Sequence, residues 1–378
     1  DRNRVIGAAT GTNNTNTKGI SCEGCTYIWI RGNVLYNIGD NSIAINWSGV
    51  RSDGFAHVTD NVMELNGSPS WVHSGVVVTA DHCVVSRNIM VTNFTSSPTN
   101  AVEIGSAVDD VIVTNNRTKN SGLVVMLSGT NILIDSNTTD GAISLNAQTT
   151  NIERVTITNN ILAGALAHIS VRAMNDPQTT SHVLVAHNSI SGSTHATRPA
   201  MLSEGTVSKL SVIGNYAHDN NNGGFALPAN EALVVGNIAY NNGLVPGSIN
   251  GDQEGFYFVN GPTTANTRTV VMNNLSYGND GYGFYFEQPQ YCDFIDNEAW
   301  NNDGNGGTPT APGWVVGTIV AVNGPLVRGA VPFGTIRMRG PGPSGAPAGT
   351  PEALIHASPG SLFHRTDDGN ASPYIKNS

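Results

Sequence analysis

The chain has 378 residues, a formal net charge of −10 at pH 7 and 12% charged residues. Too few charged side chains are present to cover the wet faces of surface helices, and the acidic balance argues against a nucleic-acid partner. The 39% hydrophobic residues exceed what a disordered chain carries. They occur in short runs, none near the roughly 18 apolar residues of a membrane span, so we expect no membrane insertion.

One pattern repeats along the chain: alternating apolar residues, then an asparagine a few positions later. Successive repeats are 21 to 37 residues apart, and a second short strand lies between most of them, as at 42–46 and 101–104. Strands of this length separated by turns are typical of the coils of a parallel β-helix, in which only stacking buries the inward side chains. The repeated asparagines are Asn33, Asn61, Asn88, Asn116, Asn137, Asn160, Asn188, Asn215, Asn237, Asn274 and Asn297.

We interpret these asparagines as scaffold residues. Asparagine tolerates the left-handed backbone conformation that a sharp turn requires, and stacked asparagine side chains can form a hydrogen-bonded ladder. The sequence therefore predicts an all-β solenoid, a single-stranded parallel β-helix of about eleven coils.

After residue 303 the composition changes. We expect three parts: the β-helix over 1–303, a Gly/Pro-rich linker with short strands over 304–349, and a small C-terminal β module over 350–378. Within the linker, Thr318–Val322 and Gly334–Met338 read as strands.

The stacked apolar-x-apolar-x-x-Asn coils over residues 18–303 resemble the right-handed parallel β-helix of the pectate-lyase-like superfamily. With the C-terminal run from Pro359 to Lys376, the resemblance is greatest to phage tailspikes and polysaccharide-degrading proteins. It implies a polysaccharide partner, an extracellular or virion location and a homotrimer. The catalytic motifs of the superfamily's known enzymes are absent as sets, so the resemblance assigns no catalytic residue.

Strand alternation identifies one candidate catalytic column. With Ile169 and Val171 pointing inward, His168 and Arg172 point outward, and Glu204 is expected on the next coil at the position equivalent to Arg172. This arrangement predicts either a surface ion pair or a sugar-cleaving site of His168, Arg172 and Glu204, with Asp176 from the adjoining turn.

Further outward residues are candidates for substrate binding. Tyrosine rings about one coil apart could stack on successive sugars, and the polar neighbours could hydrogen-bond to them. These residues are Tyr257, Tyr285, Glu287, Asn146 and Glu103, together with Trp71 and His73 on an early turn.

Two functions remain open from the sequence. The first is a carbohydrate-active protein that binds and cleaves a capsule, lipopolysaccharide or polyuronate by hydrolysis or β-elimination. The alternative is a non-catalytic carbohydrate-binding or structural β-helix. No cofactor is expected, and no metal, because no cysteine or histidine spacing matches a metal site.

Overall fold

The computed structural model describes most of residues 18–302 and short strands on either side. The described residues are 2–6, 18–24, 27–38, 41–46, 55–65, 74–92, 100–105, 108–148, 150–173, 177–195, 197–228, 231–244, 253–259, 269–286, 292–295, 297–300, 302, 314–316, 326–328, 336–338, 362–365 and 372–375.

The chain divides into two compact units, Asp1–Ser189 (unit 1) and Ile190–Ser378 (unit 2). In each unit the strands run in a repeating order through three sheets, which we call A, B and C, so that three successive strands make one coil. The described segments hold β-strands and turns but no α-helix, and therefore no helix that could cross a membrane.

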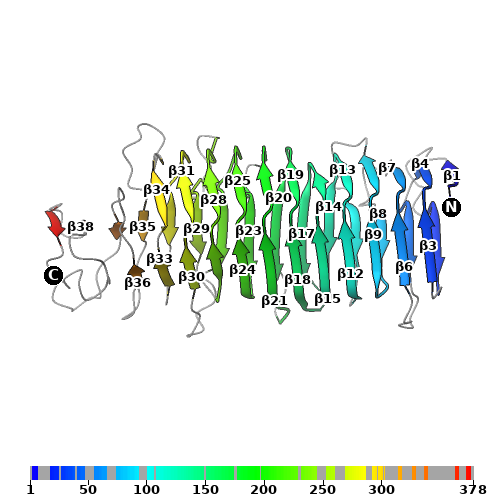
Figure 1. Ribbon diagram of the computed structural model, residues 1–378, viewed down its shortest axis with the longest axis horizontal. Coiled ribbons are helices and arrows are strands. Elements are labelled where there is room, and N and C mark those ends of the chain that lie inside the picture. The colour runs from blue at the N-terminus through cyan, green and yellow to red at the C-terminus, as the bar shows by residue number, and fades with distance from the viewer. Residues whose placement is uncertain are drawn as a thin grey trace. The chain divides into compact units, whose positions relative to one another are not determined.

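Unit 1 contributes seven strands to each sheet, and neighbours in a sheet are parallel (Figure 1). Sheet A contains β1 (Arg4–Ile6), β4 (Val34–Ile38), β7 (Val62–Leu65), β10 (Ile89–Thr92), β13 (Arg117–Lys119), β16 (Thr138–Thr139) and β19 (Ile161–Ala163). Sheet B contains β2 (Ile20–Glu23), β5 (Ile43–Asn46), β8 (Ser74–Val78), β11 (Asn100–Ile104), β14 (Gly122–Met126), β17 (Ala142–Ala147) and β20 (His168–Ala173). Sheet C contains β3 (Tyr27–Arg31), β6 (Phe55–Thr59), β9 (Cys83–Ser86), β12 (Val108–Thr114), β15 (Gly129–Asp135), β18 (Ile152–Thr158) and β21 (Thr180–Ala186).

Unit 2 repeats the arrangement, and β22 (Ser189–Ser191) lies at the boundary. Its sheet A strands are β25 (Tyr216–His218), β28 (Ile238–Tyr240), β31 (Leu275–Tyr277) and β34 (Glu298–Trp300). Its sheet B strands are β23 (Met201–Gly205), β26 (Phe225–Pro228), β29 (Phe256–Val259), β32 (Phe284–Phe286), β35 (Trp314–Val316), β37 (Ile336–Met338), β38 (Leu362–Arg365) and β39 (Ser372–Ile375). Its sheet C strands are β24 (Val207–Ile213), β27 (Leu233–Val235), β30 (Thr269–Met272), β33 (Cys292–Ile295) and β36 (Leu326–Arg328).

The strands beyond residue 303 continue these sheets. β35 pairs with β32 and β36 with β33, both parallel, and only β38 and β39 pair antiparallel. β37 falls within the expected strand Gly334–Met338, whereas Thr318–Val322 lies outside the described residues. The division at residues 303 and 349 stays a prediction.

The core consists of the inward side chains of all three sheets. In β18 the buried residues are Ile152, Val155 and Ile157, and Thr156 faces outward between the last two. All six side chains predicted to point inward at the centre of unit 1 are 0 or 1% exposed, which confirms the predicted alternation: Val155, Ile157, Ile169, Val171, Val183 and Val185. In unit 2, Phe225, Phe256 and Phe284 stack inside sheet B with ring centroids 4.8 Å apart at each step.

The repeated asparagines form buried ladders, as predicted. In unit 1 each Asn side chain donates from Nδ2 to Oδ1 of the next Asn over 2.9 to 3.0 Å, from Asn33 to Asn188. Each Oδ1 accepts a second bond from the backbone N–H of the preceding Asn, for example 3.0 Å from Asn88 N to Asn116 Oδ1. The ladder thus satisfies amide groups that would otherwise be buried without partners.

Unit 2 has two such ladders. One runs through Asn215, Asn237, Asn274 and Asn297. The other, which the sequence interpretation missed, runs through Asn220, Asn242, Asn279 and Asn302 at the turn that follows sheet A.

The left-handed conformation does not belong to the ladder asparagines. Where the preceding residue is described, it adopts this conformation instead, for example with φ of 67° at Gly32, 59° at Asp60, 54° at Arg87 and 56° at Asn115. The expectation that Asn itself supplies the sharp turn was wrong. The asparagine contributes its side-chain amide, which donates and accepts hydrogen bonds between coils, while the preceding residue makes the turn.

Substituting one ladder asparagine should be costly. Asn116→Ala leaves the backbone N–H of Asn88 without its acceptor and removes the donors to Val85 O and Asn137 Oδ1. We expect a loss of about 2 to 4 kcal/mol in the free energy of unfolding, measured by urea denaturation. Thr156→Ala, on the outer face, should cost about 0.5 kcal/mol or less. Equal losses in the two variants would contradict the ladder's role.

Candidate functional site

Among the described residues of unit 1, the most exposed aromatic side chains lie together on the outer face of sheet C. Tyr27 is 71%, Trp29 65% and Phe55 47% exposed. Tyr27 stacks on Phe55 with centroids 6.1 Å apart, Trp29 stacks on His57 at 4.4 Å, and Phe55 stacks on His82 at 5.2 Å. We call Tyr27, Trp29, Phe55, His57 and His82 the aromatic cluster.

These side chains face outward because β3 alternates strictly. Ile28 and Ile30 are buried at 5% exposure, which turns Tyr27, Trp29 and Arg31 to the opposite face. β3 is also the first strand of sheet C. Among the described residues, each ring of β3 therefore stacks on β6 with one face only. The high exposure of Tyr27 and Trp29 is consistent with their other faces being open to solvent.

A cavity of about 320 Å³ lies at the first coil, where the inward Ile28 and Ile30 line it together with Tyr27 and Trp29. This volume is at the lower end of the range of small-ligand sites. Its lining combines apolar, amide and aromatic groups: Asn3, Ile20, Cys22, Tyr27, Ile28, Trp29, Ile30 and Asn33.

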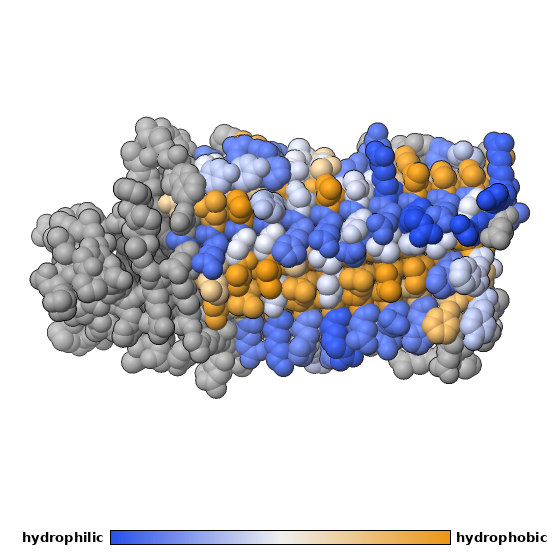
Figure 2. Space-filling view, in the orientation of Figure 1, coloured by the Kyte–Doolittle hydropathy of each residue, from blue (hydrophilic) through white to orange (hydrophobic). Residues whose placement is uncertain are grey.

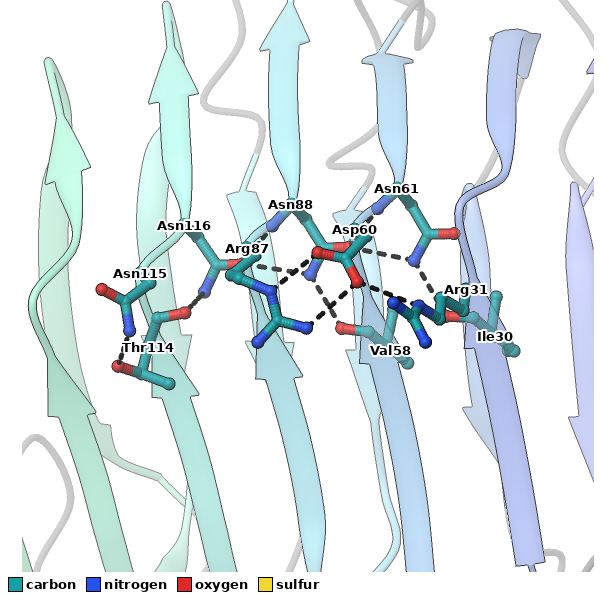
Figure 3. A network of polar contacts seen from close by, with 10 residues as sticks. All are labelled: Ile30, Arg31, Val58, Asp60, Asn61, Arg87, Asn88, Thr114, Asn115 and Asn116. Carbon is teal, nitrogen blue, oxygen red and sulfur yellow. Dashed lines mark hydrogen bonds and ion pairs between the residues drawn. The ribbon is translucent and has the colours of Figure 1, made fainter. Parts of the chain in front are cut away.

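A cationic group borders the cluster at the ends of the same strands. Arg31 Nε lies 3.2 Å from Asp60 Oδ2, and Arg87 holds the same carboxylate from Nε at 2.7 Å and Nη2 at 3.0 Å (Figure 3). The hydrogen bond from Arg87 is the main cause of the lowered pKa of Asp60. We call Arg31 and Arg87 the arginine pair.

An acidic row borders the cluster at the starts of the sheet C strands. His82 Nδ1 lies 2.9 Å from Asp110 Oδ2, Asp81 accepts the backbone N–H of Asp109 at 2.7 Å, and Asp109 accepts from Thr130 at 2.6 Å. The hydrogen bond to Asp110 raises the pKa of His82, and the charges of Asp81 and Asp109 act in the same direction. The Thr130 hydroxyl is the largest cause of the lowered pKa of Asp109.

An apolar stripe continues from the cluster along sheet C. The register aligns Trp29 and His57 with outward, half-buried residues of later coils, namely Val84, Ile112, Leu133 and Leu184, with Thr156 between the last two. Figure 2 shows an apolar band on this face of unit 1 with polar residues along it on both sides. The face thus offers apolar contact between two polar margins.

The structure places the predicted sheet B residues less favourably. His168 is 4% exposed and its Nδ1 lies 2.9 Å from Leu166 O, so the expectation that it faces solvent was wrong. Of the positions aligned with it in earlier coils, Ala101 and Leu123 are fully buried, whereas its direct partner Ala142 is half-buried. Much of this row on the outer face of sheet B is thus covered, and strand alternation does not reveal such covering.

Arg172 and Asn146 are adjacent. They are register partners on β20 and β17, and both are half-buried. Asn146 Oδ1 is buried and accepts no hydrogen bond in the described part of the chain. Glu103, on β11, accepts a 2.7 Å bond from the Ser74 hydroxyl. Glu204 is exposed on β23 of unit 2, and its pairing with Arg172 stays a prediction.

The two predicted tyrosines are register partners that contact each other. Tyr257 and Tyr285 are half-buried, with centroids 5.3 Å apart and planes tilted by 30°, and Tyr282 stacks on Tyr285 at 5.9 Å. They face outward as predicted, but they form a stack along the sheet rather than separate open platforms. The other predicted residues lie outside the described residues: Asp176, Glu287, Trp71 and His73.

The sequence analysis missed the aromatic cluster, although its signal was present. The alternation that places Ile28 and Ile30 inside also places Tyr27, Trp29 and Arg31 outside. The contribution of Phe55, His57 and His82 depends on how the coils align across segments of different length. No group of three or more His, Cys, Asp and Glu side chains within the described ranges is arranged to hold a metal ion.

Comparison with known proteins agrees with this architecture. The family model described as "Right handed beta helix region" matches residues 141–311. The chain forms a right-handed parallel β-helix. This confirms the fold that the sequence resemblance implied, while no curated protein sequence matches the chain.

Several solved structures are similar to the chain at low sequence identity. The A-module of the mannuronan C-5 epimerase AlgE4 of Azotobacter vinelandii is 12% identical, with a TM-score of 0.40 over 83% of this chain and 85% of that one. The Dettilon tailspike protein gp208 is 13% identical, with a TM-score of 0.47 over 81% of this chain and 62% of that one. The endo-xylogalacturonan hydrolase of Aspergillus tubingensis is 9% identical, with a TM-score of 0.36 over 87% and 86%.

The ion pair of His82 should be visible in its titration. Because Asp110 stabilises the imidazolium, Asp110→Asn should lower the pKa of His82, measured by NMR. The raised pKa means that the pair stabilises the folded chain fully below the ordinary histidine pKa. This contribution is lost as the pH rises through the raised value. Asp219→Asn, in unit 2, serves as a control that should leave His82 unchanged. A pKa of His82 that is insensitive to Asp110→Asn would contradict the pairing.

Proposed function

We propose that this chain binds a polysaccharide through the aromatic cluster and cleaves it, as a secreted protein or as part of a virion. The observation that carries the proposal is the pair of rings on β3, Tyr27 and Trp29, which are more than 60% exposed beside a cavity of about 320 Å³. Large aromatic residues are expensive to leave in water, so two of them on one rigid strand favour a role in binding.

The chemistry of the surroundings favours a sugar over an apolar ligand. A sugar ring has apolar C–H faces and polar edges, and it needs both an aromatic surface and hydrogen-bonding groups at the margins. The cluster provides the rings, while Asp109, Asp110 and Arg31 provide charged groups at the two margins. The apolar stripe from Val84 to Leu184 would extend the contact to a polymer that lies across several coils.

Rigid β-strands hold these side chains, so little ordering is required when a ligand binds. The stacked partners His57 and Phe55 fix the orientation of Trp29 and Tyr27 before the ligand arrives. A homotrimer, as the tailspike resemblance implies, is part of the proposal.

For cleavage we propose the sheet B column, with Glu204 and Arg172 in the chemical step and Asn146 and Glu103 in substrate binding. Asn146 is the register partner of Arg172 and is half-buried, which supports a binding role beside the proposed catalytic residues. The burial of His168 argues against its acting on a substrate at the surface. A binder without catalytic activity is the alternative.

Trp29→Ala and Tyr27→Ala should each weaken glycan binding about 10- to 100-fold, because exposed aromatic anchors carry much of the energy of a binding surface. The measurement is titration calorimetry on glycans selected from a panel of capsule, lipopolysaccharide and polyuronate fragments. Tyr216→Ala is the matched control, since Tyr216 is 49% exposed on β25 of unit 2. If both cluster variants bind as tightly as the unmodified chain, the cluster is not the binding site.

Glu204→Gln should abolish cleavage of a bound glycan and leave its affinity within about threefold, because the change removes a carboxylate and keeps the side-chain shape. Release of reducing ends measures cleavage, and ultraviolet absorbance of an unsaturated product distinguishes elimination from hydrolysis. Glu153→Gln, a carboxylate change on β18, is the control. Full activity of Glu204→Gln would exclude this column, and a glycan bound without cleavage by the unmodified chain would favour the non-catalytic alternative.

A further inference from the structure

The arginine pair is an exposed and oriented group of cations. The side chains of Arg31 and Arg87 are 63% and 58% exposed, whereas that of Asp60 between them is 32% exposed. The two residues come from different coils, and Figure 3 shows both guanidinium groups turned toward the one carboxylate. Asp60 therefore brings together two positive charges that would otherwise repel each other.

The charges of this group do not cancel. Two guanidinium groups and one carboxylate leave a net charge of about +1, since arginine stays protonated at neutral pH. A guanidinium has five N–H donors. Among the described residues, the bonds to Asp60 use one donor of Arg31 and two of Arg87. The remaining donors form a fork geometry that suits carboxylate, sulfate or phosphate.

The position of the pair relative to the aromatic cluster is fixed by β3. Arg31 follows Trp29 by two residues on the same outward face, a step of about 6.5 Å along a strand. This is roughly the size of one sugar unit. With the polymer lying across the coils, a sugar stacked on Trp29 would thus place a substituent of its ring against Arg31.

The opposite margin has the reverse polarity. Asp81, Asp109 and Asp110 lie at the starts of the sheet C strands, where they would repel an anionic group. An acidic substituent is therefore favoured at the strand ends alone, which would also orient the polymer.

We infer that Arg31 and Arg87 form an anion subsite beside the aromatic cluster, so that the polysaccharide bound there carries an acidic substituent on the sugar stacked on Trp29. This inference rests on the proposed function. The ligand chemistry is an oxyanion on a sugar, supplied by a carboxylate or by a sulfate or phosphate ester. An exposed ion pair contributes little to stability, so variants of the pair should fold normally.

The experiment compares matched ligands. Oligogalacturonate is compared with the same oligomer after reduction of its carboxyl groups, and dextran sulfate with dextran, by calorimetry at 50 and 200 mM NaCl. We expect at least one anionic ligand to bind 10-fold or more tightly than its neutral counterpart, with weaker binding at the higher salt concentration. The arm that shows the preference identifies the oxyanion as carboxylate or sulfate.

Single substitutions test whether Arg31 and Arg87 cause the preference for the anionic ligand. Arg31→Gln and Arg87→Gln should each reduce the anionic preference at least fivefold, and Arg31→Lys should recover part of it. Arg154→Gln is the matched control, because the side chain of Arg154 is 56% exposed on the same sheet and its Nε donates to Asn131 at 2.7 Å. The Arg154→Gln variant should prefer the anionic ligand as strongly as the unmodified chain does.

The outcomes separate this inference from the proposed function. Equal affinity for anionic and neutral ligands, or a preference that survives both glutamine substitutions, overturns the anion subsite. The proposed function stands in that case if Trp29→Ala still weakens binding of the neutral ligand. If neither ligand pair binds the unmodified chain, the anion subsite is overturned, and the wider glycan panel decides the proposed function.

Discussion

Hydrogen bonding between successive coils is the constraint on which the rest of the structure depends. A solenoid coil has no core of its own, and its inward side chains are buried only where the next coil stacks in register. The asparagine ladder fixes that register at one turn of every coil, because each amide both donates to and accepts from its neighbours. Steps of 21 to 37 residues between ladder positions are accommodated elsewhere in the coil. Coils of different length thus present their outward residues in straight rows.

The candidate site depends on this register between successive coils. Trp29, His57 and Val84 are 27 or 28 residues apart in sequence, yet they are successive members of one outward row. The arginine pair arises in the same way, since Arg31, Asp60 and Arg87 come from three coils and meet beside the ladder (Figure 3). A surface built from rows suits a ligand that repeats, which is why a polymer fits the observations better than a single small molecule.

The fold could be predicted from the sequence because the apolar alternation and the repeated asparagine are local patterns that recur in each coil. The ladder asparagines, the inward Ile157 and Val171 and the outward tyrosines followed from counting positions along strands. The candidate site could be predicted only in part, for two physical reasons. The burial of His168 depends on what covers the outer face of sheet B, and no strand pattern encodes that. The meeting of Arg31 with Arg87 depends on which turn residues adopt the left-handed conformation, and the sequence interpretation had assigned that conformation to the ladder asparagine instead.

The ladder also has a direction. In unit 1 every side-chain bond runs from Nδ2 of one asparagine to Oδ1 of the asparagine that follows it in the chain, so the amide dipoles point the same way from Asn33 to Asn188. An amide in the middle of such a row is polarised by neighbours on both sides, whereas an amide at the end is polarised by one. Amides with ladder neighbours on both sides therefore make stronger hydrogen bonds than an isolated pair of amides would. The loss of one asparagine consequently weakens the bonds of the coils on either side as well as its own.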